Sequence, residues 1–154
     1  VKKSQNPDGG IRYSLQSGQT SSLALSAAGA EVFLMAGQYD AKETKLACEY
    51  LKKNLDPNRT QGYHDFYTNF YGVQAMFQIG GKYWDYYRQI LHALLLHPEH
   101  YAQRPGGFWV STSHDDANAG TNYCTAMAVL ALTVEYRFLP IYQRSEEPDE
   151  RTGK

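Results

Sequence analysis

Val1-Lys2-Lys3-Ser4-Gln5-Asn6-Pro7-Asp8-Gly9-Gly10 is a turn sequence that leads into an apolar, alanine-rich stretch. The same pairing occurs twice more with drift, opening with Leu51-Lys52-Lys53-Asn54-Leu55-Asp56-Pro57-Asn58 and with Gln103-Arg104-Pro105-Gly106-Gly107-Phe108-Trp109. The period of roughly 45 to 50 residues lies in the range that is typical of stacked supersecondary units. The chain is therefore predicted to be built from repeats, each a turn followed by an apolar helix.

The segments between these turns have the apolar spacing of helices. Helices are expected over residues 20–36, 41–54, 64–79, 83–96 and 121–138. Thr20, Ser21 or Ser22 can cap the first of them. No useful strand-period alternation occurs, so the sequence predicts an all-α fold of helical hairpins stacked side by side. Residues 105–120 are expected to be irregular, and an irregular stretch of this length inside a compact domain is often functional.

The ends of the chain are expected to differ from its middle. Residues 1–143 are predicted to form a single repeat domain, and the charged residues 144–154 a disordered tail. The start at Val1, one step before a repeat turn, suggests that a preceding helix has been trimmed.

Charge and composition exclude several classes of partner. The 154 residues carry a net charge of −1 and a calculated pI of about 6.6, so binding to nucleic acid or to anionic lipid is not expected. No apolar run reaches the ~18 residues of a membrane span, which indicates a soluble protein whose location stays open. Cys48 and Cys124 lie far apart in helical patterns and are expected to be free, buried thiols.

Aromatic side chains are the most abundant candidate binding groups, because the chain holds 13 tyrosines beside six phenylalanines and two tryptophans. They can line a pocket for an apolar ligand, or they can simply fill a helical core. The candidates for a pocket are Phe66, Phe70, Tyr71, Trp84, Tyr87, Trp109 and Tyr123. Ordinary packing between hairpins would give the same pattern, so both interpretations stay open.

The Pro-Asp-Gly-Gly turn before an alanine-rich helix resembles the repeats of squalene and oxidosqualene cyclases. The third copy is the most similar, with Pro105-Gly106-Gly107-Phe108-Trp109 followed by a polar loop and Tyr123-Cys124-Thr125-Ala126-Met127. The wider group includes the β-subunits of protein prenyltransferases and shares the α/α-toroid fold. The resemblance covers residues 1–143 and implies an incomplete toroid, about half of one ring.

The residues that carry the chemistry of this group are substituted here. Oxidosqualene cyclases have Asp-Cys-Thr-Ala-Glu where this chain has Tyr123-Cys124-Thr125-Ala126-Met127, so both carboxylates are missing. A phenol is about six pKa units weaker than a carboxylic acid, and Tyr123 cannot protonate an alkene. The prenyltransferase zinc motif Asp-x-Cys falls on Asn122-Tyr123-Cys124. One thiolate without further placed ligands predicts no metal site, and no cofactor motif is found.

The resemblance and its departures together predict a non-catalytic repeat module. Such a module is expected to bind further repeats of a longer chain, a second copy, another protein or an apolar ligand such as an isoprenoid. The alternative is an isoprenoid-processing enzyme with a displaced acid at Asp115 or Asp116, in the loop before the last helix. In such an acid pair, like-charge repulsion would raise one pKa. A plainer interpretation of this loop is that Asp116 or Asn118 caps the helix that follows.

Overall fold

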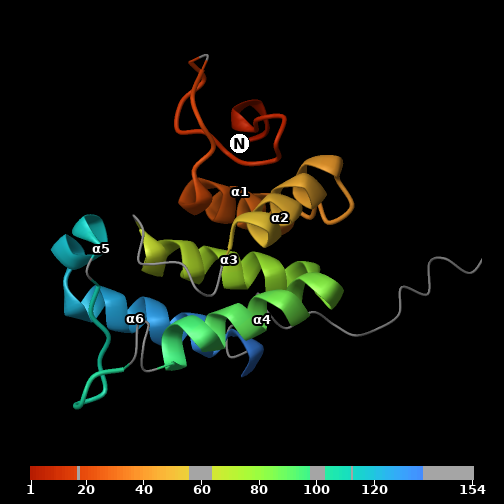
Figure 1. Ribbon diagram of the computed structural model, residues 1–154. Coiled ribbons are helices and arrows are strands. Elements are labelled where there is room, and N and C mark those ends of the chain that lie inside the picture. Colours follow the sequence, from red (N-terminus) through yellow and green to blue (C-terminus); the bar gives the residue numbers. More distant parts are fainter. Residues whose placement is uncertain (17, 56–63, 98–102, 112, 137–154) are drawn as a thin grey trace, which may run out of the picture.

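The computed structural model describes residues 1–16, 18–55, 64–97, 103–111 and 113–136, and within these ranges regular structure is helical (Figure 1). In chain order the elements are the 3-10 helix η1 (Lys2–Ser4), α1 (Leu23–Met35), α2 (Lys42–Asn54), α3 (Asp65–Ile79), α4 (Gly81–Leu96), α5 (His114–Ala119), α6 (Thr121–Leu132) and the 3-10 helix η2 (Val134–Tyr136). The prediction of an all-α fold is confirmed. The second turn, at 56–62, and the tail 144–154 lie outside the described residues.

The helices are stacked as hairpins around a central α3. Figure 1 shows the α1–α2 hairpin above α3, and α4 and α6 below it. The most extensive contact joins α1 to α3, and α3 also packs against α4 and α6. Helices α1, α3 and α6 therefore form one row, which α2 and α4 flank.

The first Pro-Asp-Gly-Gly sequence forms a tight turn that rests on α2. Gly10 O accepts a hydrogen bond from Asn6 N at 2.8 Å, and Gly9 N donates to Asn6 O at 2.9 Å. Gly9 has a φ of 91°, and a Cβ there would overlap the carbonyl of Leu46 on α2. Glycine is required at this position because it alone combines the left-handed backbone with so close an approach. The third copy also turns, with Gly107 N donating to Arg104 O at 2.9 Å.

The observed helix ends agree with the predicted ones near the start of the chain and differ from them at the last helix. Ser22 is the N-cap of α1, since its Oγ accepts from Leu25 N at 3.4 Å. The prediction of a last helix over 121–138 is wrong in length, because α6 ends at Leu132. There the Thr133 hydroxyl donates to the carbonyl of Val129 at 2.8 Å, which is the kind of local bond that competes with continued helix.

Residues 105–120 are not the uniformly irregular stretch that the sequence indicated. They contain α5, which Gly120, with a φ of 90°, separates from α6. Six residues are too few for an apolar period to be recognised, and this is why the helix was missed.

The core lies between the row α1, α3, α6 and the flanking helices α2 and α4, and it consists mainly of alanines and leucines with a few larger side chains. Its largest fully buried members include Tyr87, Phe66, Leu34, Leu51 and Met76. Cys48 and Cys124 are both buried and free, as the sequence predicts.

Candidate functional site

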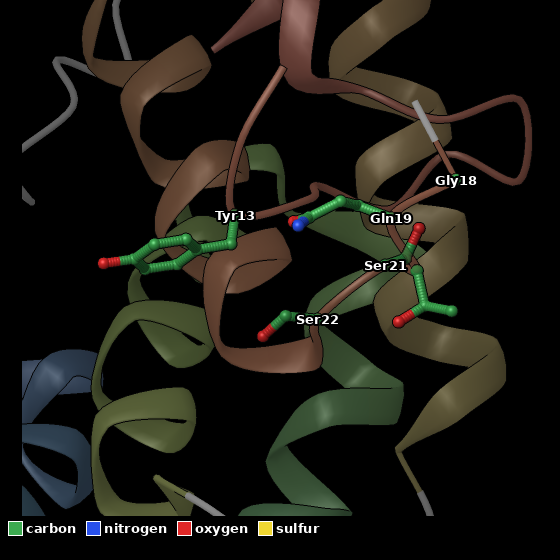
Figure 2. Close-up of a pocket in the computed structure, with 6 residues that line it drawn as sticks. Tyr13, Gly18, Gln19, Ser21 and Ser22 are labelled. Carbon is green, nitrogen blue, oxygen red and sulfur yellow. The ribbon is translucent and has the colours of Figure 1, made fainter. Parts of the chain in front are cut away.

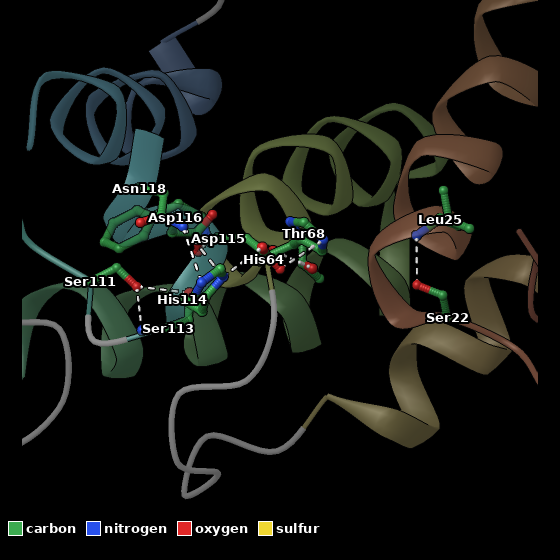
Figure 3. Close-up of polar contacts among 11 residues, drawn as sticks. Ser22, Leu25, His64, Thr68, Ser111, Ser113, His114, Asp115, Asp116 and Asn118 are labelled. Atoms are coloured by element: carbon green, nitrogen blue, oxygen red, sulfur yellow. Dashed lines mark hydrogen bonds and ion pairs between the residues drawn. The ribbon is translucent and has the colours of Figure 1, made fainter. Parts of the chain in front are cut away.

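The loop acids predicted from the sequence come to lie against the start of α3. We call this place the α3–α5–α6 corner and define it by His64, Tyr67, Tyr71, His114, Asp115, Asp116, Tyr123 and Cys124 (Figure 3 shows its polar part). Three helices converge there: α3 begins, α5 ends the polar loop, and α6 carries the sequence that resembles the cyclase motif. The corner is therefore the arrangement in which to test the predicted roles of the two aspartates.

Asp116 is buried, with 1% of its surface exposed. Its Oδ2 accepts a hydrogen bond at 3.0 Å from the backbone N–H of Phe66, in the first turn of α3. The residue before α3, His64, has a left-handed backbone with a φ of 56° and offers no side-chain cap. Asp116 thus supplies the cap for α3 from a distant part of the chain. The positive end of the helix dipole also stabilises its carboxylate. It does not cap the helix that follows it, whose N-cap is Gly120.

Asp115 lies between two imidazole rings. Its Oδ2 is 3.3 Å from His64 Nε2, and its Oδ1 is 3.2 Å from His114 Nδ1. The Asn118 amide lies 3.3 Å from the His114 ring nitrogens, so Asn118 contacts His114 and caps no helix (Figure 3). About a third of the Asp115 side chain is exposed, which makes it the more accessible of the two candidate acids.

Tyrosines cover the side of the corner that faces α6. The rings of Tyr67 and Tyr71 are 4.6 Å apart, and Phe70 lies edge-on to Tyr71 at 4.9 Å. Burial raises the pKa of Tyr123 to about 12, with a further contribution from the charge of Asp116. Tyr123 therefore keeps its proton through the neutral range, and it can donate a hydrogen bond there but cannot serve as a strong acid.

Cys124 shares this environment. Its Sγ lies 3.5 Å from the carbonyl oxygen of Asp116, and burial followed by the Asp116 charge raises the pKa of the thiol. A raised pKa disfavours the thiolate that metal binding and nucleophilic attack require. No group of three His, Cys, Asp or Glu side chains suited to a metal ion occurs in the part of the chain that the structure describes.

The aromatic residues singled out from the sequence do not form one lining. Phe66, Tyr87 and Trp109 are core residues with at most 4% of their surface exposed. The hydroxyl of Tyr87 lies 3.3 Å from the Asn69 side-chain oxygen, and the Trp109 indole N–H donates to Leu95 O at 3.0 Å. Trp84 packs edge-on against Phe77, toward the other end of α3. Phe70, Tyr71 and Tyr123 lie at or beside the corner, and Phe66 meets it through its backbone N–H.

A separate open pocket of about 460 Å³ lies between the first turn and α1, and sequence reasoning missed it (Figure 2). It is lined by Tyr13, Gly18, Gln19, Thr20, Ser21 and Ser22. The polar run Gln19-Thr20-Ser21-Ser22 is a signal for a polar surface, but three of its residues, Thr20, Ser21 and Ser22, are also good helix caps, which hid it. Ser21 is already engaged, since its Oγ donates to Asp8 Oδ1 at 2.8 Å.

Comparisons of the chain with protein-family models, with curated proteins and with solved structures find no match. Among the described residues, no helix is both long enough and apolar enough to cross a membrane. The geometry above is therefore the basis for assigning a function.

Proposed function

We propose that the chain is a non-catalytic helical-repeat module of the cyclase- and prenyltransferase-like α/α-toroid group, whose two end helices dock further helical hairpins. In this proposal the row α1, α3 and α6 is an arc of a ring. For the chain by itself, the partner is a second copy, with the α6 end of one copy against the α1 end of the next.

The observation that carries the proposal is an apolar stripe on the free side of α1. Leu25, Ala28, Val32 and Met35 follow one another at steps of three and four residues, and all the other α1 positions from Ala24 to Leu34 are buried. Val32 is 47% and Met35 58% exposed. A contiguous stripe of exposed apolar side chains commonly marks a contact surface, so we infer that another helix covers this stripe.

The other end of the row has a matching feature. On α6, Ala126, Val129 and Leu130 are all exposed, the last two at 44% each. Repeat proteins of this kind expose apolar faces where the stack ends unless a polar capping repeat covers them. Contact between two different faces is heterologous, and it propagates a row or closes a ring.

Two features of the corner support a non-catalytic role. The place of the cyclase acid is taken by Tyr123, whose pKa of about 12 leaves it protonated. Asp116, the buried acid beside it, already accepts a hydrogen bond from the backbone of α3. An acid already used to cap a helix makes a poor proton donor to an alkene.

The proposal is tested by sedimentation equilibrium of the wild-type chain and of a Val129→Lys, Leu130→Lys double variant. We expect the wild-type mass to rise with concentration and the double variant to associate at least about tenfold more weakly, because two charges would have to be buried at the contact. Gln89→Lys, at an exposed position of α4, is the matched control and should associate like wild type. A wild-type chain that stays monomeric would refute the proposal.

The second candidate is an isoprenoid-processing enzyme that uses Asp115. The observation in its favour is that Asp115 is partly exposed and paired with His64 beside the Tyr67–Tyr71 rings. A thermal shift with farnesyl diphosphate or squalene that is lost in Tyr71→Ala, together with product formation that is lost in Asp115→Asn, would establish it. The absence of both a thermal shift and a product would exclude this enzyme and favour the repeat module.

A further inference from the structure

Glu31 is a carboxyl group buried between helices, away from the corner. It lies on α1, is 2% exposed and belongs to the side that packs on α3. Its Oε1 accepts a hydrogen bond at 2.7 Å from the side-chain amide of Gln78. Its Oε2 is buried and has no hydrogen-bond partner. A carboxylate with one oxygen removed from water and unpaired is costly, whereas a neutral carboxylic acid costs far less.

The groups around Glu31 do not compensate a negative charge. On α2, the titratable group that interacts electrostatically with Glu31 is Cys48. Burial raises the pKa of this thiol to about 12, so it is neutral. Glu49, next to Cys48, is engaged at the surface by Lys82 and Tyr83 of α4.

The titratable groups of α3 and of the N-terminal segment also leave Glu31 unpaired. On α3 they are Asp65, Tyr67 and Tyr71, all in its first half, whereas Gln78 lies in its last turn. The N-terminal segment packs on α1 at Gly29 through Val1 and Ile11. Its charged groups are the Val1 amine, Lys2, Lys3, Asp8 and Arg12. Within the described residues, none of these groups is hydrogen-bonded or ion-paired to Glu31.

We propose that Glu31 and Gln78 form a proton-controlled contact between the first hairpin and α3. With Glu31 protonated, α1 packs tightly on α3. Loss of the proton places an uncompensated charge in this interface and weakens it. The α1–α2 hairpin is then held less firmly to the rest of the molecule, while the α3–α6 contact is unchanged.

The electrostatics of the site agree with this geometry and set the pH range. Burial raises the pKa of Glu31 from 4.5 to about 7, against the opposing effect of the Gln78 hydrogen bond. Because the folded-state pKa lies above the unfolded one, the folded state binds the proton more tightly. The stabilisation is therefore complete below about pH 4.5 and is lost as the pH rises through about 7.

The test is chemical denaturation at about pH 5.5 and about pH 8.5. We expect the folding equilibrium constant of the wild type to fall by about 30-fold more over this interval than that of Glu31→Gln, which keeps the side-chain shape without the titration. Glu49→Gln is the matched control, because Glu49 is exposed and ion-paired with Lys82. It should retain the wild-type pH dependence. An equal fall in wild type and Glu31→Gln would overturn the proposal.

A second measurement on the wild type covers the case in which Glu31→Gln does not fold. Calorimetric refolding at about pH 6, in two buffers of different ionisation enthalpy, should show an uptake of close to one proton per chain. Hydrogen exchange at about pH 8.5 should show α1 opening before α6. No proton uptake, or uniform opening of the two helices, would contradict the contact.

Discussion

At the scale of single residues, Asp116 shows how a side chain can suggest catalysis in sequence and serve structure in space. It was a candidate acid because it follows Asp115 in a polar loop. In the fold its carboxylate accepts the N–H of Phe66, 50 positions away, at the start of a helix that begins without a side-chain cap of its own. Pairing at that separation leaves no periodic trace in the sequence, so only the structure could reveal it.

This role predicts that Asp116→Ala lowers the free energy of unfolding by about 2 kcal/mol, because it removes a helix cap and a buried, charge-assisted hydrogen bond. Asp116→Asn keeps an acceptor and should lose only about half as much. Asp115→Ala, which alters a partly exposed contact, should cost less than about 1 kcal/mol. Urea denaturation of the three variants measures these losses of unfolding free energy. An Asp116→Ala variant as stable as wild type would show that α3 does not need the cap.

At the scale of helices, the apolar period predicted four of the five expected segments well because each buries a long stripe. The helix over 20–36 is found as Leu23–Met35 and that over 41–54 as Lys42–Asn54. What the period could not supply was the short α5 and the early end of α6 at Leu132. The end of α5 depends on Gly120 and the end of α6 on the hydrogen bond of the Thr133 hydroxyl, and neither leaves an apolar stripe in the sequence.

The candidate site was predictable only in part, for a similar reason. The residue types at the corner were recognised, including Asp115, Asp116, Tyr71 and Tyr123. Their partners His64 and Tyr67 were missed as site residues, because their proximity depends on how α3 packs against α5 and α6. Core aromatics such as Tyr87 could not be told from pocket aromatics, since both lie at three- and four-residue steps.

The α3–α4 contact gives the most direct test of packing between elements. A Cβ on Gly72 would overlap the hydroxyl of Tyr87 and lie 2.9 Å from its Cζ. We expect Gly72→Ala to cost about 1 to 3 kcal/mol through overpacking. Tyr87→Phe removes the hydroxyl and should therefore cost less in the Gly72→Ala background than in wild type. Additive costs in this double-mutant cycle would contradict close packing at this point.

At the scale of the whole molecule, α1, α3 and α6 form a row that α2 and α4 flank, and the row ends in apolar faces. The free stripe of α1 and the exposed Val129 and Leu130 of α6 are unlike the charged outer side of α2. Contiguous exposed apolar residues on a soluble domain commonly mark a contact surface. We therefore propose that the end faces, more than the acids of the corner, carry the function.

Hydroxyl-radical footprinting of the wild-type chain at low and high concentration, with the mass recorded in parallel, tests whether the two end faces meet. We predict that Met35, Val32, Val129 and Leu130 lose reactivity together as the mass rises. Leu96, which is 54% exposed at the end of α4 and outside the row, should stay reactive. Unchanged reactivity of the two end faces in a heavier species, or a chain that remains monomeric with both faces reactive, would contradict docking through these faces.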